Sequence, residues 1–211
     1  VITANMKHLT GFLSLFLCAA LPLYAADLSD LTWTTTNGEV TITDCDEAAS
    51  GELVIPATIE GNPVTSIGDY TFRDCISLTS ITIGNSVTSI GRQAFFACTN
   101  LTSITIPDSV TSIGDDAFLN CSSLRSITFQ GSAPDVNSST FLNVAGGAIA
   151  TVTVANLSSF GSDGESWNGL ILRASSVVGV LTWTTTGGQV TIIDCDEAAT
   201  GELVIPDTIE G

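Results

Sequence analysis

A period of 23 residues governs the middle of the chain. The pentapeptide Val-Thr-Ser-Ile-Gly begins at Val64, Val87 and Val110. Three further sets of residues keep the same spacing: Phe72, Phe95 and Phe118; Cys75, Cys98 and Cys121; Leu78, Leu101 and Leu124. Chance does not place so many positions in phase, and a fixed period of about 20 to 50 residues indicates a stack of similar structural units. This period therefore constrains the fold more than any local propensity does.

Each repeat is interpreted as one turn of a solenoid. In residues 101–106 apolar and hydroxyl residues alternate, which predicts a short strand with its apolar side chains inward. Pro107 cannot donate to a strand ladder and ends the strand. Gly114 is expected to supply a left-handed backbone position, and residues 117–121 are expected to form a short helical turn on the outer side.

One unit cannot bury its own apolar face, so stacked units share one core. The period and the Leu-x-x-Ile-x-Ile pattern lie within the range of leucine-rich repeats. The sequence therefore predicts a β-rich α/β solenoid, a leucine-rich repeat fold with β caps. The recurring aromatic and thiol residues are expected to be structural: Phe72, Phe95, Phe118, Cys75, Cys98 and Cys121. Buried free thiols are preferred to disulfides, because stacked positions would have to bend to reach bridge geometry.

A longer repeat frames the shorter one. Residues 31–61 recur as residues 181–211 with five differences, and each copy is interpreted as an N-terminal β cap followed by a first rung. The predicted organisation is a cap and first rung at 26–61, repeats at 62–130, a degenerate repeat and C-terminal cap at 131–174, a linker at 175–180, and the start of a second, truncated module at 181–211. The chain is therefore expected to be a fragment of a protein with tandem modules.

The first 25 residues have the pattern of a secretory signal peptide. Met6 and Lys7 open a short basic region, an apolar run follows, and Ala25 supplies a small residue before the cut. Residues 1–5 are expected to lie upstream of the true start at Met6. A membrane anchor is the alternative, but the run is shorter than the roughly 20 residues needed to span a bilayer. We expect cleavage after Ala25, a secreted or cell-surface protein, and no membrane insertion after cleavage.

Removing this segment leaves four arginines against 22 acidic residues, and no lysine or histidine. A nucleic-acid partner is excluded, because binding phosphates requires a basic surface. Serine or cysteine nucleophiles would lack a histidine base, and no phosphate-binding glycine loop is present. A carboxylate pair for glycoside hydrolysis remains compatible with the composition, but no pair is indicated. The sequence predicts no enzyme activity and no cofactor.

The densest acidic cluster lies in the expected cap. Its residues are a weak candidate for Ca²⁺, which prefers oxygen ligands: Asp44, Asp46, Glu47 and Glu52. The spacing is not that of an EF-hand loop, so a solvated acidic turn is preferred and no metal site is predicted. Zinc is not expected either, because no Cys-x-x-Cys pair exists.

The outward strand positions are the candidate binding surface. They form two columns of small hydroxyl side chains, expected on the concave face: Ser80, Thr82, Ser103, Thr105, Ser126 and Thr128. Such residues suit a solvated strand face, and they also suit recognition of a protein or glycan. Both interpretations remain open at this point.

The repeat resembles the BspA-like (Treponema pallidum-type) leucine-rich repeat. Residues 101–121 carry the distinctive string Ser-Ile-Gly-x-x-x-Phe-x-x-Cys, and the resemblance covers residues 53 to about 145. It implies a secreted or surface-exposed bacterial protein used in adhesion or protein recognition, with no shared catalytic residues. We therefore expect a non-catalytic interaction protein. The alternatives are a structural spacer in a larger extracellular protein, and a glycan-binding or hydrolytic protein whose active domain is missing.

Overall fold

The computed structural model describes residues 26–175 and two further strands, β14 (Leu181–Thr186) and β15 (Gln189–Cys195). The expected signal peptide, residues 176–180 of the expected linker and residues 196–211 of the expected second module lie outside the described residues. In the part of the chain that is described, no helix is long and apolar enough to cross a membrane.

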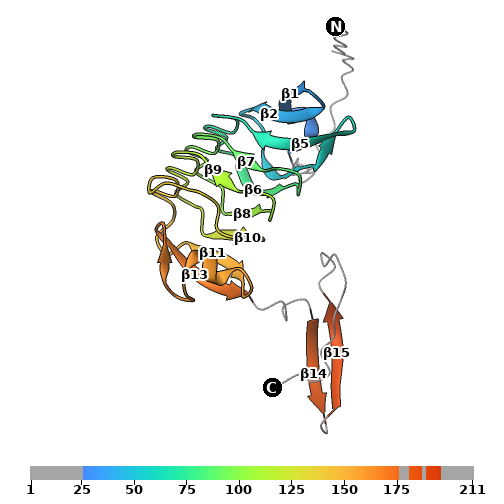
Figure 1. The fold of residues 1–211 in the computed structure, drawn as a ribbon, viewed down its shortest axis with the longest axis vertical. Coiled ribbons are helices and arrows are strands. Elements are labelled where there is room, and N and C mark those ends of the chain that lie inside the picture. Colours follow the sequence, from blue (N-terminus) through green and yellow to red (C-terminus); the bar gives the residue numbers. More distant parts are fainter. Residues whose placement is uncertain (1–25, 176–180, 187–188, 196–211) are drawn as a thin grey trace, which may run out of the picture.

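The repeats form the stacked turns of a solenoid with little helix (Figure 1). The strands with the Leu-x-x-Ile-x-Ile pattern build a seven-stranded sheet in the order β12-β13-β11-β10-β8-β6-β3. Its neighbours are parallel except for β12 and β13. The strands are β3 (Gly51–Ile55), β6 (Leu78–Ile83), β8 (Ser103–Ile106), β10 (Ser126–Phe129), β11 (Ile149–Thr153), β12 (Ser166–Trp167) and β13 (Leu170–Ser175).

A second sheet is built by the Val-Thr-Ser-Ile segments. It has six strands in the order β1-β2-β5-β7-β9, with β4 attached to β5. Strands β5, β7 and β9 are parallel, and each comes from a successive repeat. The strands are β1 (Leu31–Thr36), β2 (Glu39–Cys45), β4 (Thr58–Ile59), β5 (Asn62–Ile67), β7 (Ser89–Ile90) and β9 (Ser112–Ile113).

Hydrogen-bonded turns complete each repeat, and the helical turn expected at residues 117–121 is wrong. Asp116 and Asn120 have φ angles of 58° and 65°, and a left-handed residue interrupts the right-handed backbone that a helix requires. The turns instead bond to one another, as when the amide of Phe118 donates to the carbonyl of Thr140 in the next repeat at 2.9 Å. Hydrogen bonds between neighbouring turns therefore take the place of the bonds that would form within a helix.

The core is an apolar stripe that runs along the stack. Phe72, Phe95 and Phe118 are fully buried, and their rings stack at centroid distances of 4.9 and 5.0 Å with planes within 7° of parallel. Phe141 continues the column 5.3 Å from Phe118. Each ring in the middle of the column is covered on both faces by its neighbours. The 23-residue spacing in the sequence therefore produces regularly spaced ring contacts along the stack.

Gly114 is needed for space and does not have the left-handed backbone expected of it. A Cβ atom at Gly114 would lie 2.6 Å from the backbone nitrogen of Arg92, and one at Gly91 would lie 2.5 Å from the carbonyl carbon of Gly68. Backbone atoms cannot move aside as the end of a flexible side chain can. Glycine at this repeat position therefore permits the close approach of successive turns.

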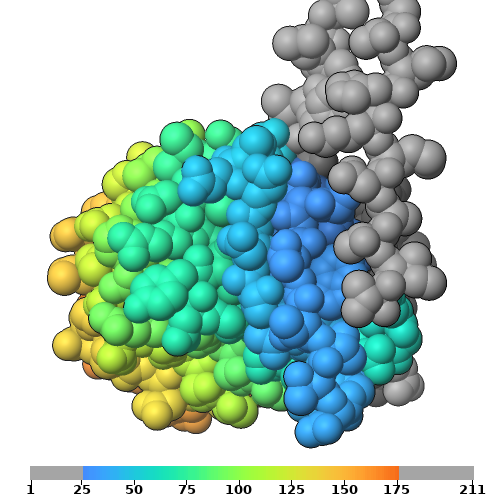
Figure 2. All heavy atoms as spheres, turned by 90° about the horizontal axis from the view of Figure 1, so that it is seen from above, coloured from blue at the N-terminus to red at the C-terminus, as the bar shows by residue number. Residues whose placement is uncertain are grey.

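The two ends of the stack are closed by different elements. At the N-terminal end the β1–β2 hairpin buries Leu31, Val40 and Ile42. In Figure 2, seen from this end, the blue atoms of this segment lie directly against the cyan and teal atoms that follow in the chain. At the other end, rings of helix α1 (Leu157–Phe160) and β12 cover the core. Phe160 and Trp167 lie 5.1 and 5.5 Å from the ring of Phe129.

Candidate functional site

The six hydroxyl residues singled out in the sequence lie on the outward side of β6, β8 and β10. The serines form one column, with Ser80 opposite Ser103 and Ser103 opposite Ser126. The threonines Thr82, Thr105 and Thr128 form a second column in the same register. We call these six residues the hydroxyl face. Their alignment follows from parallel pairing without a register shift, which keeps identical repeat positions side by side.

The hydroxyl face differs from the threonines that immediately precede the strands in how its hydroxyl groups are used. None of its six hydroxyls has a hydrogen-bond partner among the described residues. Just before β7 and β9, Thr88 donates to the carbonyl of Thr65 at 3.1 Å, and Thr111 donates to the carbonyl of Thr88 at 3.4 Å. Thr102, just before β8, donates in the same way to the carbonyl of Thr79 at 2.9 Å. Those hydroxyls tie one turn to the next, whereas the hydroxyl face keeps its donors and acceptors for solvent or a ligand.

Both columns continue beyond the six predicted residues. Val54 on β3 stands opposite Thr82, and Ile149 on β11 stands opposite Ser126. Both are apolar and exposed, at 64% and 37%. Neither residue was predicted, although Glu-Leu-Val-Ile and Ile-Ala-Thr-Val align with the Ser-Ile-Thr-Ile strands and this alignment places both residues outward. Each border of the hydroxyl face therefore has one apolar and one polar side chain, since Glu52 stands opposite Ser80 and Thr151 stands opposite Thr128.

An apolar ridge on the turns was also missed. It consists of Phe96, Leu119 and Leu142, which follow the core phenylalanines at the 23-residue spacing. Leu142 is 52% exposed, and the guanidinium of Arg73 lies 4.9 Å from the ring centre of Phe96. The repeat alignment contained this signal, because the residue after Phe95, Phe118 and Phe141 is apolar in each case, whereas Arg73 follows Phe72.

The acidic residues of the cap are used by the local backbone. The carboxylate of Asp44 accepts a hydrogen bond from the amide of Cys45 at 3.0 Å, and that of Asp46 accepts one from the amide of Ala48 at 2.9 Å. Glu52 lies on β3, in register with Ser80 of the hydroxyl face. Among the described residues, no group of three or more acidic, thiol or imidazole side chains is placed to hold a metal ion.

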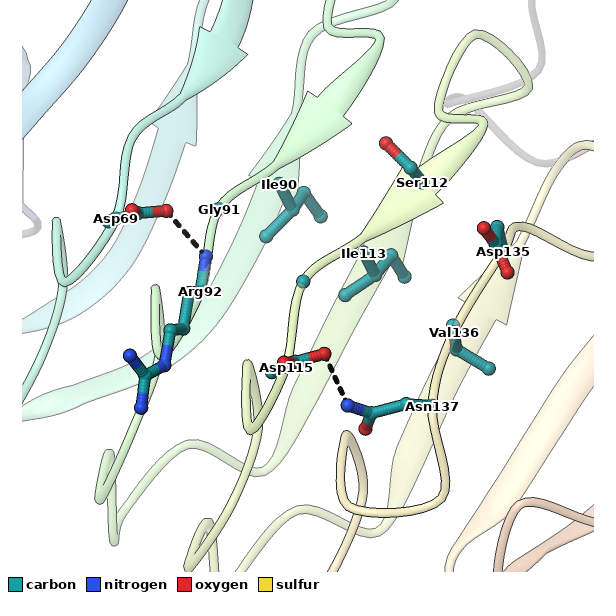
Figure 3. Close-up of a pocket in the computed structure, with 11 residues that line it drawn as sticks. Asp69, Ile90, Gly91, Arg92, Ser112, Ile113, Asp115, Asp135, Val136 and Asn137 are labelled. Carbon is teal, nitrogen blue, oxygen red and sulfur yellow. Dashed lines mark hydrogen bonds between the residues drawn. The ribbon is translucent and has the colours of Figure 1, made fainter.

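A shallow depression lies where the six-stranded sheet meets the turns (Figure 3). Two of its carboxylates connect successive repeats: Asp69 accepts from the backbone amide of Arg92 at 2.7 Å, and Asp115 accepts from the side-chain amide of Asn137. Asp135 lines its far side. Because these carboxylates already serve as links between turns, the depression is a consequence of the stacking rather than a built ligand site.

The repeat cysteines are buried free thiols, and those of Cys98 and Cys121 also act as hydrogen-bond donors. Cys75, Cys98 and Cys121 are fully buried. The thiol of Cys98 lies 3.0 Å from the carbonyl oxygen of Phe72, and that of Cys121 lies 3.0 Å from the carbonyl oxygen of Phe95. A hydrogen bond with Cys121 and burial raise the pKa of the Cys98 thiol. The thiols of Cys98 and Cys121 connect turns. The raised pKa and the burial of Cys98 make it poorly suited to nucleophilic chemistry, which requires the thiolate.

Comparison with known proteins agrees with this architecture. The family model for the BspA type leucine rich repeat region matches residues 52–163 in six copies. A search of curated proteins finds no match.

Several solved structures are similar to this chain. The leucine rich repeat protein of T. pallidum is 23% identical, with 73% of this chain and 84% of that protein covered and a TM-score of 0.48. A leucine-rich repeat protein from Bacteroides capillosus is 30% identical, with 56% and 94% covered and a TM-score of 0.47. A leucine rich cell surface protein from Faecalibacterium prausnitzii is 20% identical, with 83% and 62% covered and a TM-score of 0.41.

Proposed function

The chain belongs to the BspA-type leucine-rich repeat family, and from this premise we propose that it is a secreted, non-catalytic adhesion protein that binds a protein partner through the hydroxyl face. Proteins of this family are typically extracellular. The observation that carries the proposal is the set of six unpaired hydroxyls held in register on three adjacent strands. The basic, apolar first 25 residues support export.

The hydroxyl face is suited to binding because little order has to be created when a partner arrives. Serine and threonine side chains are short and lose little conformational freedom on being fixed. The strands beneath them are held on both sides by neighbouring strands, so the array is already in its binding geometry. Val54 and Ile149 add apolar contacts at its borders, which favours a protein partner that combines polar and apolar groups.

A non-catalytic role is supported by the state of the reactive side chains. The only lysine and the only histidine, Lys7 and His8, precede the expected cleavage point. The repeat thiols are buried, and the depression uses the carboxylates of Asp69 and Asp115 as structural acceptors. General acid–base catalysis needs a group that can reach a substrate and exchange a proton with it.

The proposal is tested by measuring binding of the purified protein to a panel of immobilised extracellular matrix proteins and glycans by biolayer interferometry. The variant Thr82→Arg/Thr105→Arg places two long cations on the hydroxyl face. We expect it to weaken binding at least about tenfold, because bulky charged groups prevent close contact with the partner.

The matched control is Thr88→Arg/Thr111→Arg, at the residues immediately before β7 and β9. It makes the same change in composition and net charge, so it separates a local contact from a general electrostatic effect. Equal weakening by both variants would assign the binding to net charge and not to the hydroxyl face. If the folded protein bound nothing in the panel, adhesion would be refuted, and binding to glycans alone would replace the protein partner by a glycan.

A further inference from the structure

The hairpin β14–β15 reproduces the hairpin β1–β2 in its pairing. In the first hairpin Leu31 stands opposite Cys45, and a register shift follows Thr32. In the second, Leu181 stands opposite Cys195, and the register shifts after Thr182. The two hairpins therefore share one backbone plan, including an irregularity that regular antiparallel pairing does not require.

The first hairpin closes the solenoid through one face and one edge. Val40 and Ile42 of β2 are fully buried against the first repeat, and β2 pairs in parallel with β5. The carbonyl of Ile42 accepts hydrogen bonds from the amide of Gly68 at 2.8 Å and from the hydroxyl of Thr71 at 3.1 Å. Docking of the cap thus requires apolar residues at alternate positions of β2 and a free strand edge on the repeat.

The sequence differences between the hairpins avoid the docking positions. Three residues differ: Asn37, Glu39 and Thr43 correspond to Gly187, Gln189 and Ile193. All three positions are exposed in the first hairpin. The positions that are buried there keep their residue types, since Leu31, Val40, Ile42 and Cys45 correspond by register to Leu181, Val190, Ile192 and Cys195. Surface positions have changed while the positions that dock have not.

Within the described residues, β14 and β15 form a two-stranded sheet of their own. An isolated two-stranded hairpin is only marginally stable in water. We propose that β14–β15 is a second solenoid cap, and that its partner is the open edge of a BspA-type repeat with a Val-Thr-Ser-Ile strand like that of β5. This capping would use an interface like that of β2 with β5 and does not depend on the hydroxyl face or on adhesion.

The full chain allows a direct test. The variant Val40→Asp/Ile42→Asp disables the first cap and leaves the edge of β5 open. We expect β15 to occupy this edge, in the same chain or in another copy, so that amide hydrogen exchange in residues 189–195 becomes at least about tenfold slower than in the unmodified protein. Adding Val190→Asp/Ile192→Asp should abolish this protection. Equal exchange rates in the double and quadruple variants would overturn the proposal.

A second variant covers the case in which loss of the first cap unfolds the solenoid. Asn37→Gly/Glu39→Gln/Thr43→Ile gives the first hairpin the strand sequences of the second. If the second hairpin is a competent cap, the melting temperature stays within about 2 °C of the unmodified value. A fall of more than about 5 °C, or rapid exchange of residues 39–45, would show that the second sequence cannot cap a repeat.

Discussion

Substitution of Phe95, in the middle of the phenylalanine column, tests how much the stacking of repeats contributes to stability. Phe95 is fully buried and stacks on Phe72 at 4.9 Å and on Phe118 at 5.0 Å. Replacing a buried phenylalanine with alanine costs about 3–5 kcal/mol, because apolar contacts are lost and a cavity remains. Each stacked pair contributes about 0.5–1.5 kcal/mol beyond burial. Phe95→Ala, which loses two stacks, should therefore lie at the upper end of this range.

Phe72→Ala is the matched comparison. Phe72 is equally buried, but its ring has one stacked neighbour, Phe95. Phe72→Ala should therefore lower the free energy of unfolding by less than Phe95→Ala does, and the difference should equal the contribution of one stacked ring pair, about 1 kcal/mol. For a solenoid of this size, that difference corresponds to about 2–4 °C in melting temperature.

The assay is urea unfolding followed by far-ultraviolet circular dichroism, with tryptophan fluorescence as a second probe. Trp33 and Trp167 lie near opposite ends of the solenoid, so coincident transitions would show that the stack unfolds as one unit. Phe95→Leu serves in case Phe95→Ala does not fold. It keeps most of the apolar volume but loses both ring stacks, so it should lower the free energy of unfolding by about 1–3 kcal/mol. Equal costs for Phe72→Ala and Phe95→Ala, or costs below about 2 kcal/mol for both, would refute the reasoning.

Three further predictions concern individual contacts. Gly91→Ala should destabilise the protein by about 1–3 kcal/mol in urea unfolding, because its Cβ would meet the backbone of Gly68; Gly146→Ala, where nothing lies within 4 Å of the added atom, should be close to neutral. Hydrogen bonds from Ser139 and Gln93 lower the pKa of Asp116 in the folded protein. The stability that the Asp116 carboxylate adds is therefore fully present above its ordinary pKa of 3.8, and it is lost as the pH falls through the lower pKa of the folded state. The difference in melting temperature between the unmodified protein and Asp116→Asn should therefore shrink from about pH 6 to about pH 3, and an unchanged difference would contradict this. Native Cys98 should resist iodoacetamide in a mass-spectrometric assay and react only after unfolding, because its thiol is buried with a raised pKa; rapid labelling of the folded protein would show that the turn opens.

The hydroxyl face illustrates where sequence reasoning reaches its limit. The alternation in residues 101–106 was sufficient to place Ser103 and Thr105 outward. It did not distinguish them from Thr88 and Thr111, which are also outward and also hydroxyl-bearing. The difference is that Thr88 and Thr111 reach a carbonyl of the preceding turn. That contact depends on how successive turns are offset, which no single repeat contains.

The turns are a second place where contacts between repeats, and not the local sequence, decide the structure. The spacing of Phe118 and Cys121 is close to that of a helix and therefore predicts a helical turn. In the structure the left-handed residues Asp116 and Asn120 direct the amide of Phe118 to the next turn. A helix satisfies its bonds within itself, whereas these turns satisfy theirs between neighbours, and only the stack supplies those neighbours.

The sequence by itself determined that the chain is a leucine-rich repeat solenoid, because a 23-residue period of apolar positions can be buried only against copies of itself. It also determined which residues enter the core and which strand positions face outward. The tertiary structure decided why Gly91 and Gly114 must be glycines, which hydroxyls remain unpaired, and which bonds the cysteine thiols make. These properties arise between turns, where distances of a few ångströms depend on the packing of the whole stack.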